Sequence, residues 1–284
     1  MFLLPAATRG EVMPRAALLA LVLLPLGCGG PAPATAPSGG RFEPSWSDEF
    51  EGSSVDATRW HVMDEFPQAW PETPWRRNWK KENVTVEDGA LVIRTVREPV
   101  GFSTGAVMTG DWGKPVLFQQ AFGRFEARVR FPRQPGHWCA FWLENPDVGR
   151  VDGSGRDGTE IDVMERAWLI DQAQHTLHWD GYAAAHRSAE RLVTGRGLND
   201  GGWHVFRVDW HPDEYVFFVD DRETWRTRAG GVCQSPNWIL LTEEIGNFGS
   251  GPGQWGVGPI EQATLPDEYR VDYVRVWRYV PPAG

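Results

Sequence analysis

The chain has 284 residues, of which 41% are hydrophobic and 16 are tryptophan. This length and hydrophobic fraction suit one large all-β domain or two small ones with a real core. The formal net charge of −10 and the pI of ≈ 5.2 argue against polyanionic partners such as nucleic acid. Tryptophan is more abundant than such a core requires, and indole faces stack well on the C–H faces of sugar rings.

The N-terminal residues 1–27 predict a signal peptide. Arg9 and Arg15 precede an apolar run, 16–26, that is too short to span a bilayer but typical of a signal-peptide core. The run ends at Cys28 in a sequence that resembles the bacterial lipobox, although Pro25 departs from the usual leucine. We therefore expect an exported protein, either secreted or held in the cell envelope by a lipid on Cys28.

Residues 28–44 are rich in Gly, Pro, Ala and Ser, which predicts a flexible linker. A single folded domain is expected over residues 45–284, and we expect it to be a monomer. Two cysteines remain in it, Cys139 and Cys233, and an oxidising compartment would allow them to pair.

The first half of this domain has the pattern of short strands and turns. Residues 83–87 and 90–95 flank Asp88-Gly89, a dipeptide that supplies the positive φ angles of a tight hairpin turn. Apolar and charged residues alternate over 125–131, which predicts a strand with one buried face. Residues 138–143 are large on both faces, so we expect that strand in the middle of the sandwich, with one face in the core and the other in a groove.

The second half continues the same pattern. Residues 204–210 and 215–220 flank a turn at Pro212-Asp213 and predict another hairpin. The last predicted strand, 269–279, alternates imperfectly, which we interpret as burial on both faces. No convincing amphipathic helix of useful length is found, so the sequence predicts an all-β sandwich of two antiparallel sheets.

Three carboxylates lie within six residues near the middle of the chain. On a strand Glu160 and Asp162 share one face, whereas Glu165 is out of phase by one residue. A bulge at Val163 or Met164 would return Glu165 to the face of the other two. Carboxylates on one surface are the arrangement that glycoside hydrolysis requires. A solvated acidic strand and a set of calcium ligands are the alternatives.

The segment 158–168 resembles the signature of family 16 glycoside hydrolases, in the bulged form with two residues between the aspartate and the second glutamate. Similar landmarks precede it at 122–128 and 136–143 and follow it at 203–210 and 271–277. The resemblance implies a concanavalin A-like β-jelly roll with a glycan cleft on its concave sheet.

The resemblance also implies a role for each acid. Glu160 is expected to be the nucleophile, Glu165 the general acid/base, and Asp162 the residue that orients and tunes the pair. The chemistry of the residues does not order them by itself, since neighbouring carboxylates raise one another's pKa by repulsion. In a bulged strand the outer two should lie about 5–6 Å apart, which favours retention through a glycosyl-enzyme intermediate. We expect no cofactor for catalysis.

Several tryptophans are candidates for sugar binding. Trp138 and Trp142 share one face of the strand before the signature, and we predict that they form a stacking floor. Trp75, Trp79 and Trp112 lie in loop-like segments and are candidates for the cleft walls.

Two further candidates come from later strands. The family often places a His-Trp pair near the acid/base, which corresponds here to His178 and Trp179, with an ordinary structural histidine as the alternative. Glu243 and Glu244 point in opposite directions on a predicted strand, and we assign Glu243 to the cleft.

Many family members carry a calcium ion remote from catalysis. The matching positions are backbone oxygens near Glu49 and Gly89 and the carboxylate of Asp272, which could equally accept a hydrogen bond within the sheet. No His/Cys cluster has the spacing of a zinc site.

Two segments near the expected cleft edges differ from those of many laminarinases. Residues 153–157 lack the Trp-Pro pair of many laminarinases, and 103–108 lack an arginine often found there. We favour a β-1,3- or mixed-linkage glucan, with an algal-type galactan as the alternative. A transglycosylase with the same residues stays open, as does a non-catalytic carbohydrate-binding protein, although such a protein would be expected to lack the acids.

Overall fold

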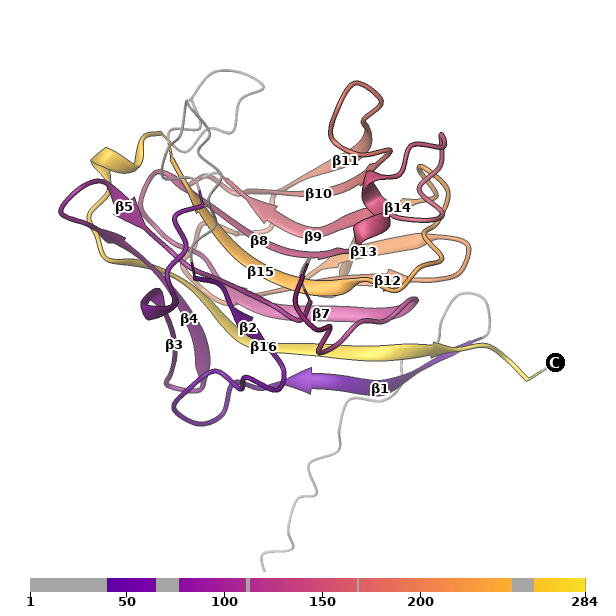
Figure 1. Cartoon of the computed structure of the whole chain (residues 1–284), viewed down its shortest axis with the longest axis horizontal. Helices are drawn as coiled ribbons and strands as arrows, with labels where there is room; N and C mark the ends of the chain where they lie inside the picture. Colours follow the sequence, from indigo (N-terminus) through magenta and orange to yellow (C-terminus); the bar gives the residue numbers. More distant parts are fainter. Residues whose placement is uncertain (1–39, 65–76, 111–112, 168, 247–257, 284) are drawn as a thin grey trace, which may run out of the picture. The chain divides into compact units, whose positions relative to one another are not determined.

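The computed structural model describes residues 40–64, 77–110, 113–167, 169–246 and 258–283 (Figure 1). These residues belong to one compact unit and form an all-β fold. The predicted signal peptide and most of the predicted linker lie outside them. Strand β1 (Arg41–Asp48) begins four residues before the predicted start of the domain. None of the helices in the described ranges is long and apolar enough to cross a membrane.

Two sheets make up the fold, and every pairing between their named strands is antiparallel. The nine-stranded sheet has the order β14 (Arg222–Thr227), β13 (Tyr215–Val219), β12 (His204–Trp210), β7 (Gly123–Arg130), β16 (Asp267–Val280), β4 (Ala90–Arg97) and β3 (Val84–Glu87), with β1 on β16 and β5 (Phe102–Ser103) on β4. The seven-stranded sheet has the order β11 (Arg187–Thr194), β10 (Gln172–Trp179), β9 (Glu160–Arg166), β8 (His137–Glu144), β15 (Trp238–Ile245), β6 (Ala106–Met108) and β2 (His61–Val62). Three short 3₁₀ turns complete the elements: η1 (Lys81–Asn83), η2 (Pro146–Gly149) and η3 (Ile260–Gln262).

The inner faces of the two sheets share one apolar core. Phe125 and Val129 on β7 of the nine-stranded sheet belong to the same buried cluster as Phe141 and Leu143 on β8 of the seven-stranded sheet. This burial is the main source of stability in a sandwich, at roughly 25 cal/mol for each Å² of apolar surface removed from water. It leaves the other face of the seven-stranded sheet available for a site.

Most of the predicted strands are confirmed. The first hairpin is β3 and β4, with positive φ angles at Asp88 (53°) and Gly89 (72°) as a tight turn requires. The second is β12 and β13. Strand β8 lies between β9 and β15, in the middle of its sheet, as its large residues on both faces indicated.

The interpretation of the closing strand was wrong. Strand β16 is not buried on both faces, because its residues alternate between buried and half-buried positions. The alternation is imperfect because the register with β7 shifts between Val271 and Tyr273. A local irregularity, rather than two-sided burial, accounts for the sequence pattern.

The two cysteines do not pair. Cys139 on β8 and Cys233 in the segment before β15 are both buried free thiols. The Sγ of Cys139 lies 3.7 Å from the backbone oxygen of Arg166, and that of Cys233 lies 3.6 Å from the backbone oxygen of Ser235. The disulfide that we considered is therefore absent from the structure.

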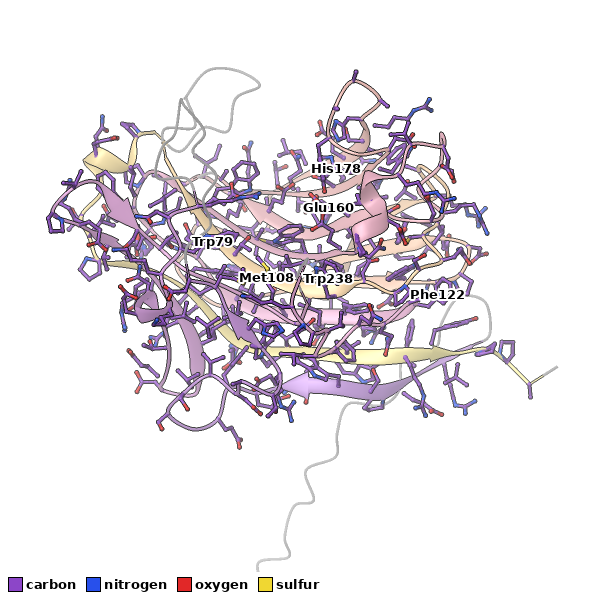
Figure 2. All side chains as sticks on the ribbon, viewed as in Figure 1. Trp79, Met108, Phe122, Glu160, His178 and Trp238 are labelled. Carbon is purple, nitrogen blue, oxygen red and sulfur yellow. The ribbon has the colours of Figure 1, made fainter. Side chains whose placement is uncertain are left out.

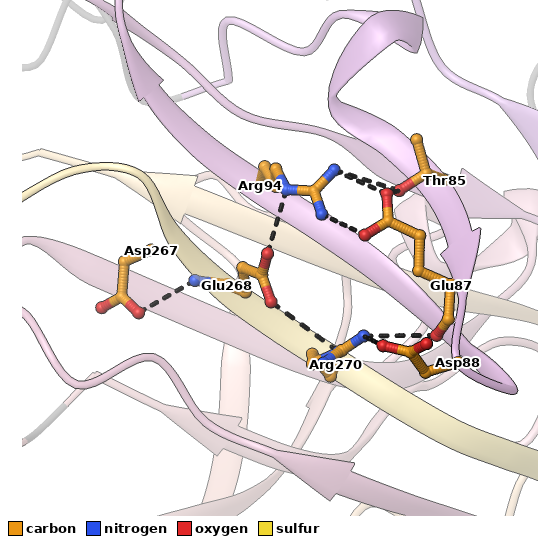
Figure 3. Close-up of polar contacts among 7 residues, drawn as sticks. All are labelled: Thr85, Glu87, Asp88, Arg94, Asp267, Glu268 and Arg270. Atoms are coloured by element: carbon orange, nitrogen blue, oxygen red, sulfur yellow. Dashed lines mark hydrogen bonds and ion pairs between the residues drawn. The ribbon is translucent and has the colours of Figure 1, made fainter.

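A network of charged side chains joins β3, β4 and β16 on the face turned away from the core (Figure 3). Arg94 donates to Glu268 at 2.9 Å and to Glu87 at 2.9 Å, and Arg270 donates to the backbone oxygen of Glu87 at 3.2 Å. Partly exposed ion pairs contribute little, typically about 0–1 kcal/mol each. The network therefore fixes the register of these strands more than it stabilises them.

Candidate active site

Strand β9 contains the predicted bulge. From Asp162 to Glu165 it advances by three residues, while β8 and β10 on either side each advance by two. Val163 and Met164 are both fully buried in the core, which is the arrangement of a bulge with two side chains on one side. Glu160, Asp162 and Glu165 consequently share the opposite face.

This face lines an open cleft with a volume of about 640 Å³. Strand β9 contributes the three acids, and β8 and β15 contribute much of the remaining floor. Glu160 and His178, from the adjacent strands β9 and β10, lie close together in Figure 2. The volume suits a few sugar units, since ligand pockets commonly measure about 300–1,000 Å³.

Glu165 has two hydrogen-bond donors in the cleft. Trp138 Nε1 donates to its Oε1 at 3.2 Å and Thr176 Oγ1 donates to its Oε2 at 2.7 Å. Burial nevertheless raises the pKa of Glu165 to about 8, with a smaller contribution from the charge of Glu160. A carboxyl group with this pKa is protonated at neutral pH and able to act as a general acid.

Glu160 has a different partner. The Tyr182 hydroxyl donates to its Oε2. Burial raises the pKa of Glu160 to about 7, and the Tyr182 hydrogen bond and the charge of Arg77 act in the opposite direction. Glu160 therefore loses its proton at lower pH than Glu165, which is the order expected for a nucleophile beside a general acid.

Asp162 lies between the two glutamates and is almost completely buried. Burial raises its pKa, and the charges of Glu165 and Glu160 raise it further. Its Oδ2 lies 3.4 Å from His178 Nε2, which in turn lies 3.9 Å from Glu160 Oε1. Asp162 thus couples the two glutamates electrostatically.

His178 is neutral at physiological pH. Burial and the neighbouring His186 lower its pKa to about 4, and its Nδ1 lies 2.9 Å from His186 Nε2. The ligand atoms of Glu160, Asp162 and His178 all lie within 4.8 Å of one another, the spacing of a cation site. The structure thus places a neutral histidine at the edge of the three acids.

The predicted tryptophan floor is present. Trp138 and Trp142 both line the cleft and are half-buried, and Trp142 Nε1 donates to Thr242 Oγ1 at 3.0 Å. Trp79 also lines the cleft, although its side chain is almost entirely buried. Trp75 and Trp112 lie outside the described residues.

Two predicted sugar-binding residues do not reach the cleft. Trp179 follows His178 on β10 and therefore points to the opposite face, into the core between the sheets. Glu243 is fully buried and its Oε1 lies 2.8 Å from His137 Nδ1. The neighbour of that residue, Glu244, lines the cleft instead and pairs with Arg77.

The sequence interpretation missed several residues of the site, among them Arg77 and His186 in the cleft lining and three that contact the acids or Tyr182. Glu144 lies on β8 in phase with the two floor tryptophans, and Thr176 lies on β10 in phase with His178, so strand alternation could have found both. Tyr182 follows the turn after β10, where no periodic pattern predicts the direction of a side chain.

The only side chain among the suggested calcium ligands, the Asp272 carboxylate, contacts an arginine. Asp272 Oδ2 accepts a hydrogen bond from Arg128 on the adjacent strand at 2.7 Å, which is the alternative that we considered. The Glu49 carboxylate accepts two from Arg275, at 3.0 and 2.8 Å. Gly89 lies in the turn between β3 and β4. A calcium ion would have to replace the Arg128 contact to use the Asp272 carboxylate.

Relatives with known names share most of this chain. A beta-glucanase from Rhodothermus marinus is 29% identical over 98% of this chain and 99% of its own length. A keratan-sulfate endo-1,4-beta-galactosidase from Sphingobacterium multivorum is 28% identical over 84% of this chain and 55% of its own length. A glucan endo-1,3-beta-glucosidase A1 from Niallia circulans is 26% identical over 82% of this chain and 37% of its own length.

Solved structures have the same fold. The endo-beta-1,3-glucanase from Pyrococcus furiosus superposes with a TM-score of 0.69 at 24% identity, over 89% of this chain and 100% of its own. The β-jelly roll that we expected is therefore confirmed. The profile of Glycosyl hydrolases family 16 matches residues 72–239, which is more than half of the chain and includes all three cleft acids on β9. The chain belongs to Glycosyl hydrolases family 16.

Proposed function

We propose that the protein is a retaining, endo-acting hydrolase that cleaves internal β-linkages of a polysaccharide by double displacement. Glu160 is the nucleophile, Glu165 is the general acid and then the general base, and Asp162 tunes both. The observation that carries the proposal is the bulge of β9, which brings all three carboxylates to one face of a cleft with a tryptophan floor.

The first step forms the glycosyl-enzyme intermediate. Glu160 attacks the anomeric carbon while Glu165 gives its proton to the leaving oxygen, so the glycosidic bond breaks as the ester bond forms. In the second step the ionised Glu165 takes a proton from water, which attacks the same carbon and releases Glu160. The pKa of about 8 for Glu165 and of about 7 for Glu160 support this division of roles near neutral pH.

The favoured substrate is a β-1,3- or mixed-linkage glucan. Two of the relatives described above have names that specify a glucan, and one of these aligns over nearly the whole of both chains. The third is named a keratan-sulfate endo-1,4-beta-galactosidase, and an algal-type galactan stays the second candidate. The described cleft lining offers five carboxylates against one arginine, which favours a neutral glycan over a sulfated one.

Release of reducing sugar from laminarin, lichenan, agarose, carrageenan and xyloglucan tests the proposal, with Glu160→Gln as the control. We expect hydrolysis of laminarin or lichenan, a loss of at least roughly 10³-fold in the variant, and a β-anomer as the first product by NMR. Equal release by wild type and variant would remove the site assignment. Release from agarose or carrageenan alone would replace the glucan by a galactan and leave the site intact.

The same assay separates the remaining alternatives. A transglycosylase would lengthen glycan chains without a net gain of reducing ends, because a sugar replaces water in the second step. A non-catalytic binding protein would retain laminarin on a column and release nothing. The three cleft acids favour hydrolysis over simple binding.

We also propose that the protein is exported, on the basis of the N-terminal sequence, and that it is a monomer. Lipid attachment at Cys28 would place it in the envelope, whereas cleavage of a plain signal would release it. Fractionation of cells that produce wild type and Cys28→Ala separates the two, since only a lipoprotein moves from the membrane fraction to the soluble one. A structural calcium ion at Asp272 and backbone oxygens near Glu49 and Gly89 is part of the same proposal, as the analogy with the family suggests.

A further inference from the structure

The Tyr182 hydroxyl lies between two carboxylates in the cleft. It donates to Glu160 Oε2 and lies 2.9 Å from Glu144 Oε1. The three residues come from separate places in the chain: Tyr182 from the segment between β10 and β11, Glu144 from the end of β8, and Glu160 from the start of β9. All three line the cleft, and Glu144 is only 2% exposed.

Tyr182 has only one hydrogen for its contacts with two carboxyl groups. A phenol has one hydrogen to donate and lone pairs to accept, while an ionised carboxylate can only accept. Desolvation of the hydroxyl inside the cleft, together with the charges of Glu160 and Glu144, raises the pKa of Tyr182 far above its usual value, so the phenol keeps its hydrogen. If that hydrogen serves Glu160, a favourable contact with Glu144 requires a proton on Glu144 that is donated to the phenol oxygen. The three groups then form a chain that ends on Glu160.

The two oxygens of Glu160 therefore differ. Oε2 accepts the Tyr182 hydrogen bond, whereas Oε1 faces His178 Nε2 at 3.9 Å, which is beyond hydrogen-bond distance. Attack on an anomeric carbon needs a carboxylate oxygen that is held in a fixed direction and keeps its full electron density. Oε2 shares its density with the Tyr182 hydroxyl, whereas Oε1 accepts no hydrogen bond from the described residues and is the more nucleophilic oxygen.

We propose that Tyr182, anchored by Glu144, is a positioning residue that holds Glu160 so that its Oε1 attacks the sugar. The inference rests on the proposed function, because it assumes that Glu160 is the nucleophile. It adds two residues that lie outside the acid signature of β9. The Tyr182 ring is 58% exposed, so the fold does not depend on its burial.

Several charged groups surround Glu160, and a test must separate Tyr182 from them. They are Glu144 on β8, Asp162 and Glu165 on β9, His178 on β10, His186 after it, Glu244 on β15 and Arg77. Removing only the Tyr182 hydroxyl leaves each of these side chains in place.

The test is the pH dependence of kcat/KM for wild type and Tyr182→Phe on the glucan that the wild type hydrolyses. The acid limb reports ionisation of Glu160 and the basic limb ionisation of Glu165. Tyr182→Phe removes the hydrogen bond that lowers the pKa of Glu160, so the acid limb should move to higher pH while the basic limb stays. We expect kcat/KM at the optimum to fall roughly 10- to 100-fold, the cost of a hydrogen bond to a charged group.

Thr176→Val is the matched control. It removes a hydrogen bond from Glu165 rather than Glu160, so it should move the basic limb to higher pH and leave the acid limb. Glu144→Leu has no donor, so it should reduce kcat/KM in the wild-type background and have little further effect in Tyr182→Phe, where the chain to Glu160 is already broken.

The outcomes distinguish this inference from the proposed function. An inactive wild type would remove the proposed function itself. An active wild type with a Tyr182→Phe variant within two-fold of it and an unmoved acid limb would overturn the positioning role alone. A fall in kcat/KM with both limbs unmoved would also overturn it, since that is the effect of a lost sugar contact. Thermal unfolding midpoints of all variants establish that each is folded.

Discussion

Glu160 and Glu165 are the same residue type on one strand, and their surroundings make them different acids. Glu165 receives hydrogen bonds from an indole and a threonine, whereas Glu160 receives one from a phenol that also contacts Glu144. Burial raises the pKa of both, to about 8 and to about 7 respectively. The proposed division between general acid and nucleophile therefore depends on residues that lie outside the signature.

Residues on β10 and β15 show where the interpretation of the sequence fails. His178 and Trp179 were both assigned to the cleft, but consecutive residues on a strand face opposite ways, so only one can reach it. The choice of Glu243 over Glu244 is wrong because the sequence of β15 does not alternate between apolar and polar residues. All eight of its residues are buried, so no pattern shows which face a side chain occupies. Thr242 lines the cleft, and Glu244, two residues further along the strand, therefore shares its face.

Glu165→Gln should stabilise the protein at alkaline pH. The folded-state pKa of Glu165, about 8, is above the ordinary value of 4.5, so its contribution to stability is fully present below about pH 4.5 and is lost as the pH rises through 8. The amide does not ionise and avoids this loss. We expect the free energy of unfolding of the variant to exceed that of the wild type by on the order of 1–3 kcal/mol at pH 9 and by much less at pH 5.

Denaturant unfolding at the two pH values measures this difference. Glu51→Gln is the matched control, because Glu51 is exposed on the surface and its replacement should change stability equally at both. A gain for Glu165→Gln that is the same at pH 5 and pH 9 would contradict the burial argument.

The bulge of β9 is the structural element that the sequence predicted best. Glu160 and Asp162 are in phase and Glu165 is not, and a buried strand cannot turn one acid into the core without a large cost in free energy. That physical constraint predicted both the existence and the position of the bulge. The irregularity in β16 was not predicted, although the sequence carries the same kind of signal: Arg270 and Asp272 are in phase and Arg275 is not.

Deletion of Met164 should leave the three acids on one face. Without the extra residue the strand reads Glu160, Ile161, Asp162, Val163, Glu165, which alternates regularly and needs no bulge. We expect a folded protein with measurable hydrolysis, destabilised by roughly 2–4 kcal/mol because a buried methionine is lost.

Deletion of Ile161 is the comparison for this experiment. It also removes one buried residue, but it places Glu160 and Asp162 next to each other and so turns Glu160 toward the core. We expect no detectable hydrolysis from this variant under conditions where the Met164 deletion is active. Equal activity of the two deletions would mean that the face of the strand does not matter, which would contradict the role of the bulge.

The two sheets of the sandwich carry different features on their outer faces. The nine-stranded sheet carries the ion-pair network and the suggested calcium positions on its outer side, and the seven-stranded sheet carries the cleft. Composition and alternation predicted the class of fold and most of its strands. Beyond the two hairpins, they did not predict which strands would be neighbours, because antiparallel pairing across long connections leaves no periodic signal in the sequence.

Chelation should affect stability rather than chemistry. If calcium binds at Asp272, removal by EDTA should lower the thermal unfolding midpoint, and added calcium should restore it, since a ligand stabilises only the state that binds it. Asp272→Asn should abolish the calcium effect. Because the site is on the other sheet, we expect activity at 25 °C to change less than two-fold. An unfolding midpoint that is indifferent to EDTA would remove calcium from the proposal.

The burial of Glu160 and Glu165 has a thermodynamic consequence for ligand binding. A neutral glycan that displaces water from the cleft increases the cost of a charge on either carboxyl, so it favours their protonated forms. Near pH 7–8, where both groups are partly ionised, binding must then take up protons from the buffer. The heat of binding will consequently depend on the ionisation enthalpy of the buffer, and affinity will weaken as the solution becomes alkaline. Protons therefore bind to the cleft together with the uncharged sugar.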